Sequence, residues 1–168
     1  SALEDCSMSP TSSAALAGTH DVIDPRGPRF GAVVTSAVLA AALILGPGGG
    51  LPLLAVQLLA FAAGALLGVR YQPYGWLFRK LVRPRIGPPT EFEDARPPRF
   101  AQAVGLTFAA VGLVGLLAGA AAVCYGAIGG ALLAALLNAL FDFCLGCELY
   151  LLGRRVLGAR ADQSGPRS

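Results

Sequence analysis

The residues with the clearest chemical potential in this chain are two cysteines in a Cys-x-x-Cys arrangement, Cys144 and Cys147, followed directly by Glu148. On a helix, positions three residues apart lie on one face, so the two sulfur atoms can meet or share a partner. Glu148 stands one turn beyond Cys144 and can accept a proton from that thiol. The pattern predicts a catalytic dithiol for thiol redox or sulfur transfer, with Cys144 attacking and Cys147 resolving.

Two other interpretations of the cysteine pair stay open. Cysteine is a small apolar residue that is often buried for packing alone. A structural metal ion needs about four ligands, and this segment offers two thiols and one carboxylate. Cys6 lies in the N-terminal tail, Cys124 falls near the opposite end of its span, and His20 has no neighbouring cluster of ligands. We therefore expect no metal ion and no cofactor.

The electrostatic environment of the pair depends on whether its helix is continuous. In a continuous helix both cysteines would lie near the negative C-terminal end, which raises the pKa of a thiol. Gly146 leaves room for a break near Phe143, with a second short helix following. The sequence allows both arrangements.

Two long blocks without any Asp, Glu, Lys or Arg, residues 30–69 and 100–141, dominate the rest of the chain. Only 14% of all residues are charged, against about 25% in typical soluble domains. A membrane span needs about 20 apolar residues, so each block has the length of a helical hairpin. We predict an all-α integral membrane protein with four transmembrane helices, at residues 30–45, 51–69, 101–120 and 125–147.

The basic residues predict the orientation of these spans. All 13 lie before the first block, between the blocks or after the second. The positive-inside rule assigns these three segments to the cytoplasm, so both termini are expected there. The basic residues flank apolar spans, so we expect lipid and not nucleic acid as their partner. The excess of arginine, alanine and glycine suggests a GC-rich bacterial genome and hence an inner-membrane location.

An internal repeat opens the two blocks. Residues 23–30 read IDPRGPRF, and residues 93–100 read EDARPPRF. Five positions match in register: Asp24 with Asp94, Arg26 with Arg96, Pro28 with Pro98, Arg29 with Arg99, and Phe30 with Phe100. Because each copy begins and ends in the cytoplasm, we predict two parallel hairpin repeats related by an axis along the membrane normal.

The predicted organisation follows from these boundaries. A disordered cytoplasmic tail (1–22) precedes a transmembrane domain (23–156), and a second cytoplasmic tail (157–168) ends the chain. The transmembrane domain comprises a hairpin (30–69), a cytoplasmic loop (70–100) and a hairpin (101–153). The outer turns are expected at 46–50 and near 121–126. In the loop, residues 75–83 predict a short helix on the membrane surface, and residues 84–98 an extended segment.

The charged repeat, residues 70–78 (RYQPYGWLF) and residues 138–150 (NALFDFCLGCELY) resemble an uncharacterised bacterial membrane family, domain-of-unknown-function family 4395. The resemblance covers about residues 23–156, and its most specific part is the Phe-Cys-x-Gly-Cys element. It implies a four-span membrane protein and a gene neighbourhood with thioredoxin-like and sulfurtransferase genes. No reaction comes with this resemblance.

The sequence favours a cytoplasm-facing membrane dithiol that exchanges electrons or sulfane sulfur with a thioredoxin-like or rhodanese-like partner. The alternative is a non-catalytic membrane scaffold or accessory subunit, in which the cysteines only pack and the basic loop docks a partner. A small-solute carrier ranks last, because its intramembrane polar groups would be limited to Gln57, Asn138 and Asp142. Whether the protein is an enzyme, and whether it forms a homo-oligomer, is left open.

Overall fold

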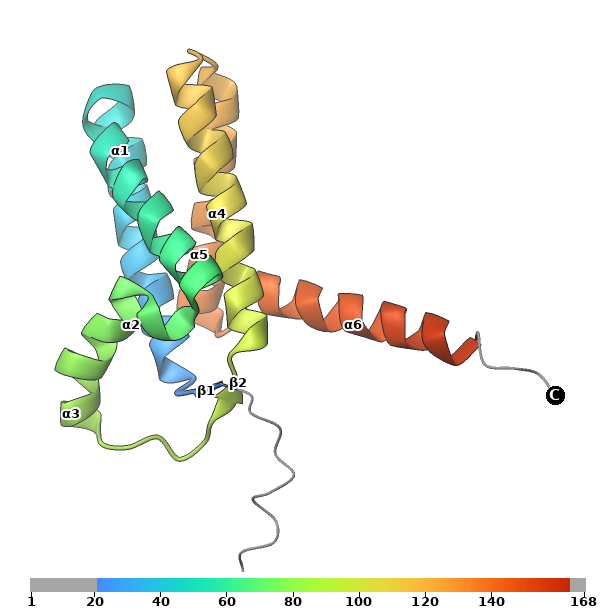
Figure 1. Ribbon diagram of the computed structural model, residues 1–168. Coiled ribbons are helices and arrows are strands. Elements are labelled where there is room, and N and C mark those ends of the chain that lie inside the picture. Colours follow the sequence, from blue (N-terminus) through green and yellow to red (C-terminus); the bar gives the residue numbers. More distant parts are fainter. Residues whose placement is uncertain (1–20, 164–168) are drawn as a thin grey trace, which may run out of the picture.

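The structure, a computed structural model, describes residues 21–163, with side chains described as far as residue 158 (Figure 1). The expectations for residues 1–20, including the disordered tail, Cys6 and His20, fall outside the described residues, as do those for residues 164–168. Among the described residues, the regular secondary structure is helical apart from two strands of two residues each. The prediction of an all-α fold is confirmed.

Helix α1 runs over Arg26–Ala62 but is interrupted at Gly46, whose φ of 66° and ψ of −164° are not helical. Figure 1 shows the chain reversing direction within α1 and returning alongside its first half. Glycine adopts such a positive φ without strain. At Gly50 a Cβ atom would collide with the carbonyl oxygen of Ala42, so this turn has room only for glycine. Residues 46–50 therefore make the turn that the sequence predicts.

A π-helical turn, η1 (Ala63–Leu67), ends this first helical stretch, and Gly68 follows with a φ of 110°. The connecting segment then forms four short helices: η2 (Val69–Tyr71), α2 (Pro73–Leu77), η3 (Phe78–Val82) and α3 (Arg83–Ile86). These include the short helix expected over residues 75–83.

The strands β1 (Val22–Ile23) and β2 (Glu93–Asp94) pair antiparallel, with Val22 opposite Asp94 and Ile23 opposite Glu93. The two copies of the repeated motif therefore meet directly. Helix α4 (Arg96–Leu117), a turn at Gly119, and helix α5 (Ala121–Phe141) follow the second copy. This turn lies a few residues before the expected position.

Helix α6 (Leu145–Gln163) is the largest departure from the sequence expectation. Figure 1 shows it leaving the bundle at a steep angle to α4 and α5. The span expected at residues 125–147 ends instead at Phe141. Helix α6 also runs into residues 157–168, which the sequence assigns to a tail.

Within the described part of the chain, three helical stretches are long and apolar enough to cross a membrane: Arg26–Leu67, Arg96–Leu117 and Ala121–Phe141. The core between them is built from residues of α1, α4 and α5, including Leu39, Leu54, Ala109 and Ile128. Many large apolar side chains face outward, where a bilayer would solvate them, for example Leu59, Val114 and Leu133.

The two repeated segments make corresponding contacts. The Nε of Arg29 donates to the carbonyl oxygen of Ala139, near the end of α5, at 3.4 Å. Arg99 donates to the carbonyl oxygens of Ala65 and Leu66, near the end of the first helical stretch, at 2.8 and 3.0 Å. Each arginine thus binds the last carbonyls of a helix in the other half of the chain, where the helix dipole is negative.

Candidate functional site

The end of α5 sets up the cysteine pair. Asp142 has a left-handed conformation with a φ of 57°, which aspartate tolerates better than most residues. Its N–H donates to the carbonyl oxygen of Asn138 at 3.2 Å, and the N–H of Phe143 donates to that of Leu137 at 3.3 Å. This pair of bonds closes the helix and redirects the chain.

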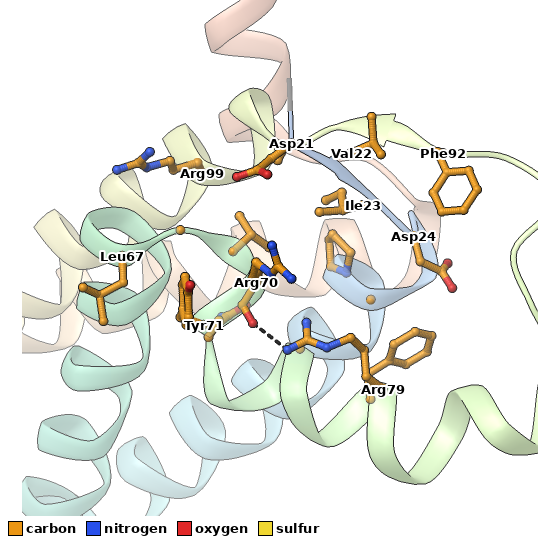
Figure 2. A pocket seen from close by; sticks show the side chains of 18 of the residues that line it. Asp21, Val22, Ile23, Asp24, Leu67, Arg70, Tyr71, Arg79, Phe92 and Arg99 are labelled. Atoms are coloured by element: carbon orange, nitrogen blue, oxygen red, sulfur yellow. Dashed lines mark hydrogen bonds between the residues drawn. The ribbon is translucent and has the colours of Figure 1, made fainter. Parts of the chain in front are cut away.

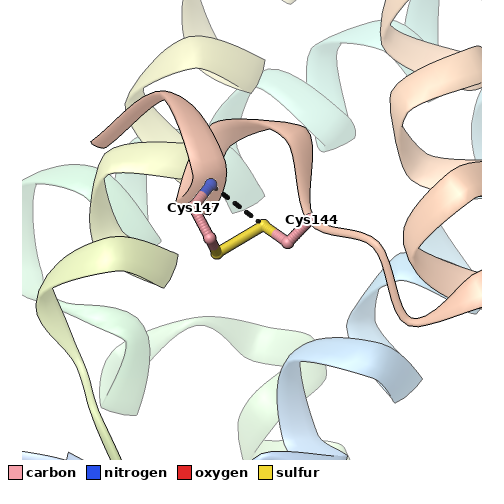
Figure 3. Close-up of a disulfide and its surroundings, with 2 residues drawn as sticks. All are labelled: Cys144 and Cys147. Atoms are coloured by element: carbon pink, nitrogen blue, oxygen red, sulfur yellow. Dashed lines mark hydrogen bonds between the residues drawn. A yellow bond between two sulfur atoms is a disulfide. The ribbon is translucent and has the colours of Figure 1, made fainter. Parts of the chain in front are cut away.

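Cys144 occupies the position just before α6, and its sulfur caps that helix. The N–H of Cys147 donates to the Sγ of Cys144 at 3.3 Å (Figure 3). The first helical bond of α6 runs from the N–H of Glu148 to the carbonyl oxygen of Cys144 at 3.0 Å. We call residues 142–148 the cysteine turn.

A disulfide joins Cys144 to Cys147 across this first turn, with the two Cα atoms 5.2 Å apart. Of the two arrangements left open above, the chain adopts the broken helix. Cys144 therefore lies at the positive end of the α6 dipole and not at the negative end of a longer helix. The positive end of a helix dipole stabilises negative charge.

The acidic residues of the cysteine turn face solvent. Glu148 is exposed in the first turn of α6, and within the described residues its carboxylate has no hydrogen-bond partner. Asp142 is also exposed, at the end of α5. Glu148 is thus accessible to solvent one turn from Cys144.

The start of α6 is fixed against α4. Gly146 is buried, and a Cβ atom there would lie 2.6 Å from both Cα and Cβ of Ala101. The rings of Phe100 and Tyr150 meet with their centroids 5.8 Å apart. These contacts hold the cysteine turn against the N-terminal part of α4.

A cavity of about 300 Å³, here called the inter-helix cavity, reaches Cys144 from between α1, α4 and α5. Its lining is mostly apolar and includes Phe61 and Phe108, and none of the described residues that line it is charged. Three polar side chains also line it: Thr35, Gln102 and Asn138. Of the intramembrane polar residues that the sequence singles out, only Asn138 lines this cavity.

Buried hydrogen bonds connect the cavity wall to the loop. The Tyr74 hydroxyl donates to Oε1 of Gln57 at 2.9 Å, and Nε2 of Gln57 donates to the Thr35 hydroxyl oxygen at 3.3 Å. Gln57 is completely buried, and burial raises the pKa of Tyr74 in the loop. Nε2 of Gln72 also donates to Oε1 of Gln102, at 2.9 Å.

A second, larger pocket of about 480 Å³ lies beside the repeated segments and the connecting segment (Figure 2). We call it the arginine-lined pocket. Its charged lining residues are Asp21, Asp24, Arg70, Arg79, Arg83, Arg96 and Arg99. Arg79 donates to the backbone carbonyl oxygen of Arg70 at 2.6 Å, which joins two sides of the pocket.

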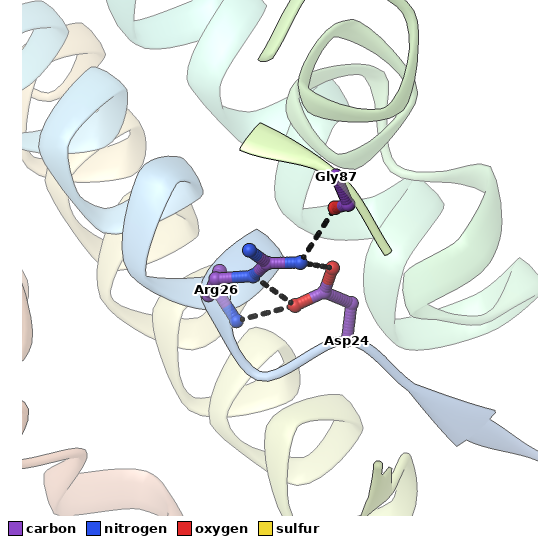
Figure 4. Close-up of polar contacts among 3 residues, drawn as sticks. All are labelled: Asp24, Arg26 and Gly87. Carbon is purple, nitrogen blue, oxygen red and sulfur yellow. Dashed lines mark hydrogen bonds and ion pairs between the residues drawn. The ribbon is translucent and has the colours of Figure 1, made fainter. Parts of the chain in front are cut away.

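Asp24 organises the edge of this pocket (Figure 4). It accepts hydrogen bonds from the backbone N–H and from the guanidinium group of Arg26, each at 3.0 Å. Arg26 also donates to the carbonyl oxygen of Gly87 at 3.1 Å. Burial raises the pKa of Asp24, but the Arg26 hydrogen bonds and the charges of Arg26 and Arg83 outweigh it, so that the pKa is lowered overall.

Sequence reasoning missed Thr35 and Gln102 as lining residues beside the cysteines. Both are polar residues inside the charge-free blocks, which is the signal that could have drawn attention to them. Gln57, which the sequence did single out, belongs to the hydrogen-bonded network and not to the cavity lining.

The fold and the site together define a class: a helical membrane protein with a cysteine pair at the start of a helix that leaves the bundle. The family model described as "Domain of unknown function (DUF4395)" matches residues 23–155, so the chain belongs to this family. No curated protein and no solved structure gives a significant match.

Proposed function

We propose that this protein is a membrane dithiol that exchanges electrons with a thioredoxin-like partner, or sulfane sulfur with a rhodanese-like partner. The observation that carries the proposal is the position of Cys144, at the N-terminal end of α6 and bonded to Cys147. A cysteine there has the electrostatic support that a nucleophilic thiolate needs.

The exchange proceeds in two balanced steps. The Cys144 thiolate attacks the partner's disulfide, forms a mixed disulfide and releases one partner thiolate. The Cys147 thiol loses its proton, to Glu148 or to water, and its sulfur attacks the Sγ of Cys144. The second partner thiolate leaves, and the Cys144–Cys147 disulfide remains. For sulfur transfer, the Cys144 thiolate instead attacks the outer sulfur of a cysteine persulfide on the rhodanese-like partner. Cys144 then carries the persulfide, and the partner's cysteine leaves as a thiolate.

The proposed topology has four spans in two parallel hairpin repeats, with both termini in the cytoplasm of a bacterium and the helices in its inner membrane. The reversal at Gly46 and the crossed contacts of Arg29 and Arg99 support it. Reporter fusions after Ser168 and within residues 84–98 should report the cytoplasm, and a fusion within residues 46–50 should report the outside. A periplasmic signal from residues 84–98 would overturn this topology.

The side-chain pattern and the direction of α6 support access to the cysteine pair from the cytoplasm. Leu149, Leu152 and Val156 follow one face of the helix at helical spacing, and all three are exposed. By the same spacing, Arg154 and Arg155 fall outside this apolar face of the helix. A helix of this pattern, steeply inclined to the bundle (Figure 1), suits the membrane surface. Glu148 and the cysteine turn would then lie where a soluble partner can reach them.

Thiol trapping in intact cells tests the proposal. The Cys147→Ser variant should accumulate a mixed disulfide or persulfide on Cys144, because no resolving thiol releases it. The Cys144→Ser variant should accumulate much less, at unchanged protein abundance. Cys124→Ser, which removes the buried free cysteine, is the control and should behave as the wild type. Equal, slow alkylation of Cys144 and Cys147, at the rate of an ordinary cysteine, would contradict the proposal.

The alternative function is a non-catalytic scaffold or accessory subunit. The tight contact of Gly146 with Ala101 favours it, since a disulfide across that turn would also hold α6 in place. This alternative predicts the opposite result from the same variants. Cys144→Ser and Cys147→Ser would both lower protein abundance, and neither would trap a partner.

A further inference from the structure

We propose that the inter-helix cavity binds the ring of a lipid-soluble quinone, and that this quinone oxidises the reduced Cys144–Cys147 pair. The redox step rests on the proposed function, whereas the binding step does not. A partner dithiol first reduces the Cys144–Cys147 disulfide by the reverse of the exchange described above, and the quinone is the small-molecule oxidant that then returns the pair to its disulfide form.

The position of the cavity connects the dithiol to the lipid phase. Cys144 and Leu145 form part of its wall, and the remaining lining residues come mainly from α1, α4 and α5. Its volume of about 300 Å³ stands at the lower end of small-ligand sites. That volume suits a single substituted ring whose isoprenoid tail remains in the bilayer.

The lining selects against charged ligands. Among the residues that the structure describes, none that lines the inter-helix cavity is charged, whereas five arginines line the arginine-lined pocket. Transfer of a phosphate group into such an uncharged, mostly apolar site is unfavourable. A nicotinamide or flavin nucleotide is therefore a poor occupant, and a neutral lipid-soluble oxidant is a good one.

The polar groups of the lining fit two quinone oxygens. The Asn138 side-chain amide has no hydrogen-bond partner within the described residues, so its N–H groups are available. Gln102 accepts a bond with its oxygen, which leaves its amide nitrogen free to donate. Thr35 accepts from Gln57 and keeps its own proton to donate. A few placed donors in an apolar cavity fix the orientation of such a ligand.

The redox step balances without another reactant. The two thiols of Cys144 and Cys147 give up two electrons and two protons and form their disulfide. The quinone accepts both electrons and both protons and leaves as the hydroquinone. The disulfide present in the structure is the product of this step on the protein side.

The experiment uses the full chain in lipid nanodiscs, reduced and freed of reductant. Decylubiquinone is the probe, because its fully substituted ring cannot add a thiol. The wild type should convert one quinone per chain while its thiols disappear. Ala134→Phe fills the cavity and should slow this conversion at least about tenfold. Leu133→Phe places the same aromatic side chain at a neighbouring, largely exposed position outside the cavity lining and should react as the wild type.

Binding is measured separately with the Cys144→Ser/Cys147→Ser variant, which cannot react. Equilibrium dialysis should show that it still binds decylubiquinone. Adding Asn138→Leu should weaken that binding roughly five- to tenfold, as expected for the loss of one hydrogen bond. Circular dichroism of each variant verifies that the helices are intact.

The outcomes separate this inference from the proposed function. If Ala134→Phe still exchanges thiols with thioredoxin but no longer reduces the quinone, both the proposed function and the quinone inference are supported. Thiol exchange without any quinone conversion in the wild type overturns the quinone step alone. Quinone binding to the Cys144→Ser/Cys147→Ser variant, without any thiol exchange by the wild type, supports the site and overturns the proposed function. Loss of a co-purified phospholipid from Ala134→Phe, with quinone conversion unchanged, shows that the cavity holds an acyl chain and overturns the inference.

Discussion

Two turns of the chain, residues 70–76 and the cysteine turn at 142–148, can be compared position by position. In the first, the N–H of Trp76 donates to the carbonyl oxygen of Gln72 at 3.0 Å as α2 begins. In the second, the N–H of Glu148 donates to the carbonyl oxygen of Cys144 at 3.0 Å as α6 begins. Gln72 and Cys144 thus hold the same position before a new helix.

The aromatic contacts continue this correspondence. Phe78, six residues after Gln72, packs on Phe30, and Tyr150, six residues after Cys144, packs on Phe100. Both pairs have ring centroids 5.8 Å apart, with interplanar angles of 44° and 47°. The contacted rings are the corresponding phenylalanines of the repeated motif.

The two turns differ in what the residue before the helix does. Gln72 is only 3% exposed and donates to Gln102. Cys144 is partly exposed, caps its own helix and bonds to Cys147. The comparison teaches that similar backbone turns can serve two purposes. The first is held by buried polar side chains, and the second carries the partly exposed Cys144–Cys147 disulfide.

The largest expected effect tests the buried polar network of the first turn. Gln57→Leu should lower the free energy of unfolding by about 2–3 kcal/mol, because it removes two bonds and leaves the Tyr74 hydroxyl buried without a partner. Thermal unfolding in detergent, followed by circular dichroism, measures this effect. Tyr74→Phe alone should lower the free energy of unfolding by less than Gln57→Leu does.

The double variant Gln57→Leu/Tyr74→Phe sharpens this test. It removes both the Tyr74 hydroxyl and the Gln57 amide. It should therefore lower the free energy of unfolding by less than the sum of the two single changes. Strictly additive costs would show that the Tyr74–Gln57 bond does not hold the first turn.

The second turn depends on close packing instead. Gly146→Ala should destabilise the protein by about 1–2 kcal/mol, because the new Cβ meets Ala101 and cannot be accommodated without moving α6. Gly153→Ala in the same helix is the matched control, since nothing lies within 4 Å of a Cβ there. It should be neutral or slightly stabilising, because alanine favours the helix over glycine. Equal effects of the two changes would refute the packed contact at the cysteine turn.

Much of the fold follows from the sequence, because its signals are local. The charge-free blocks indicate the apolar helices, and the glycines of residues 46–50 indicate the reversal within α1. The break before α6 was left open by the sequence. Asp142 decides it by adopting a left-handed conformation, and an aspartate within an otherwise apolar helix gives only a weak signal for this.

The candidate site could be predicted only in part. The spacing of Cys144 and Cys147 is visible in the sequence, but their position at the start of α6 depends on the turn at Asp142. The inter-helix cavity was not predictable, because it arises where residues far apart in the chain, such as Thr35 and Asn138, come together. Such contacts depend on tertiary packing and leave no local pattern.

A smaller effect distinguishes the two repeat arginines. Arg99→Met should lower the free energy of unfolding by about 1 kcal/mol, since Arg99 makes two hydrogen bonds to helix-terminal carbonyls at 2.8 and 3.0 Å. Arg29→Met should cost only a few tenths of a kcal/mol, because Arg29 makes one longer bond, at 3.4 Å. Methionine keeps most of the apolar stem in both variants. Thermal unfolding measures both variants. A larger loss of stability in Arg29→Met than in Arg99→Met would contradict this prediction.

The smallest effect concerns the two repeat aspartates and appears only in acid. The pKa of Asp24 is lowered from its model-compound value of 3.8, so the folded state favours the carboxylate more than the unfolded state does. Its contribution to stability is complete above about pH 4 and is lost as the pH falls through the lowered pKa of the folded state. The melting temperature of the wild type should therefore fall on acidification below about pH 4. Asp24→Asn should remove this part of the fall, whereas Asp94→Asn, which keeps Asp24, should retain it. Parallel curves of melting temperature against pH for the wild type and Asp24→Asn would show that the pair with Arg26 does not stabilise the fold.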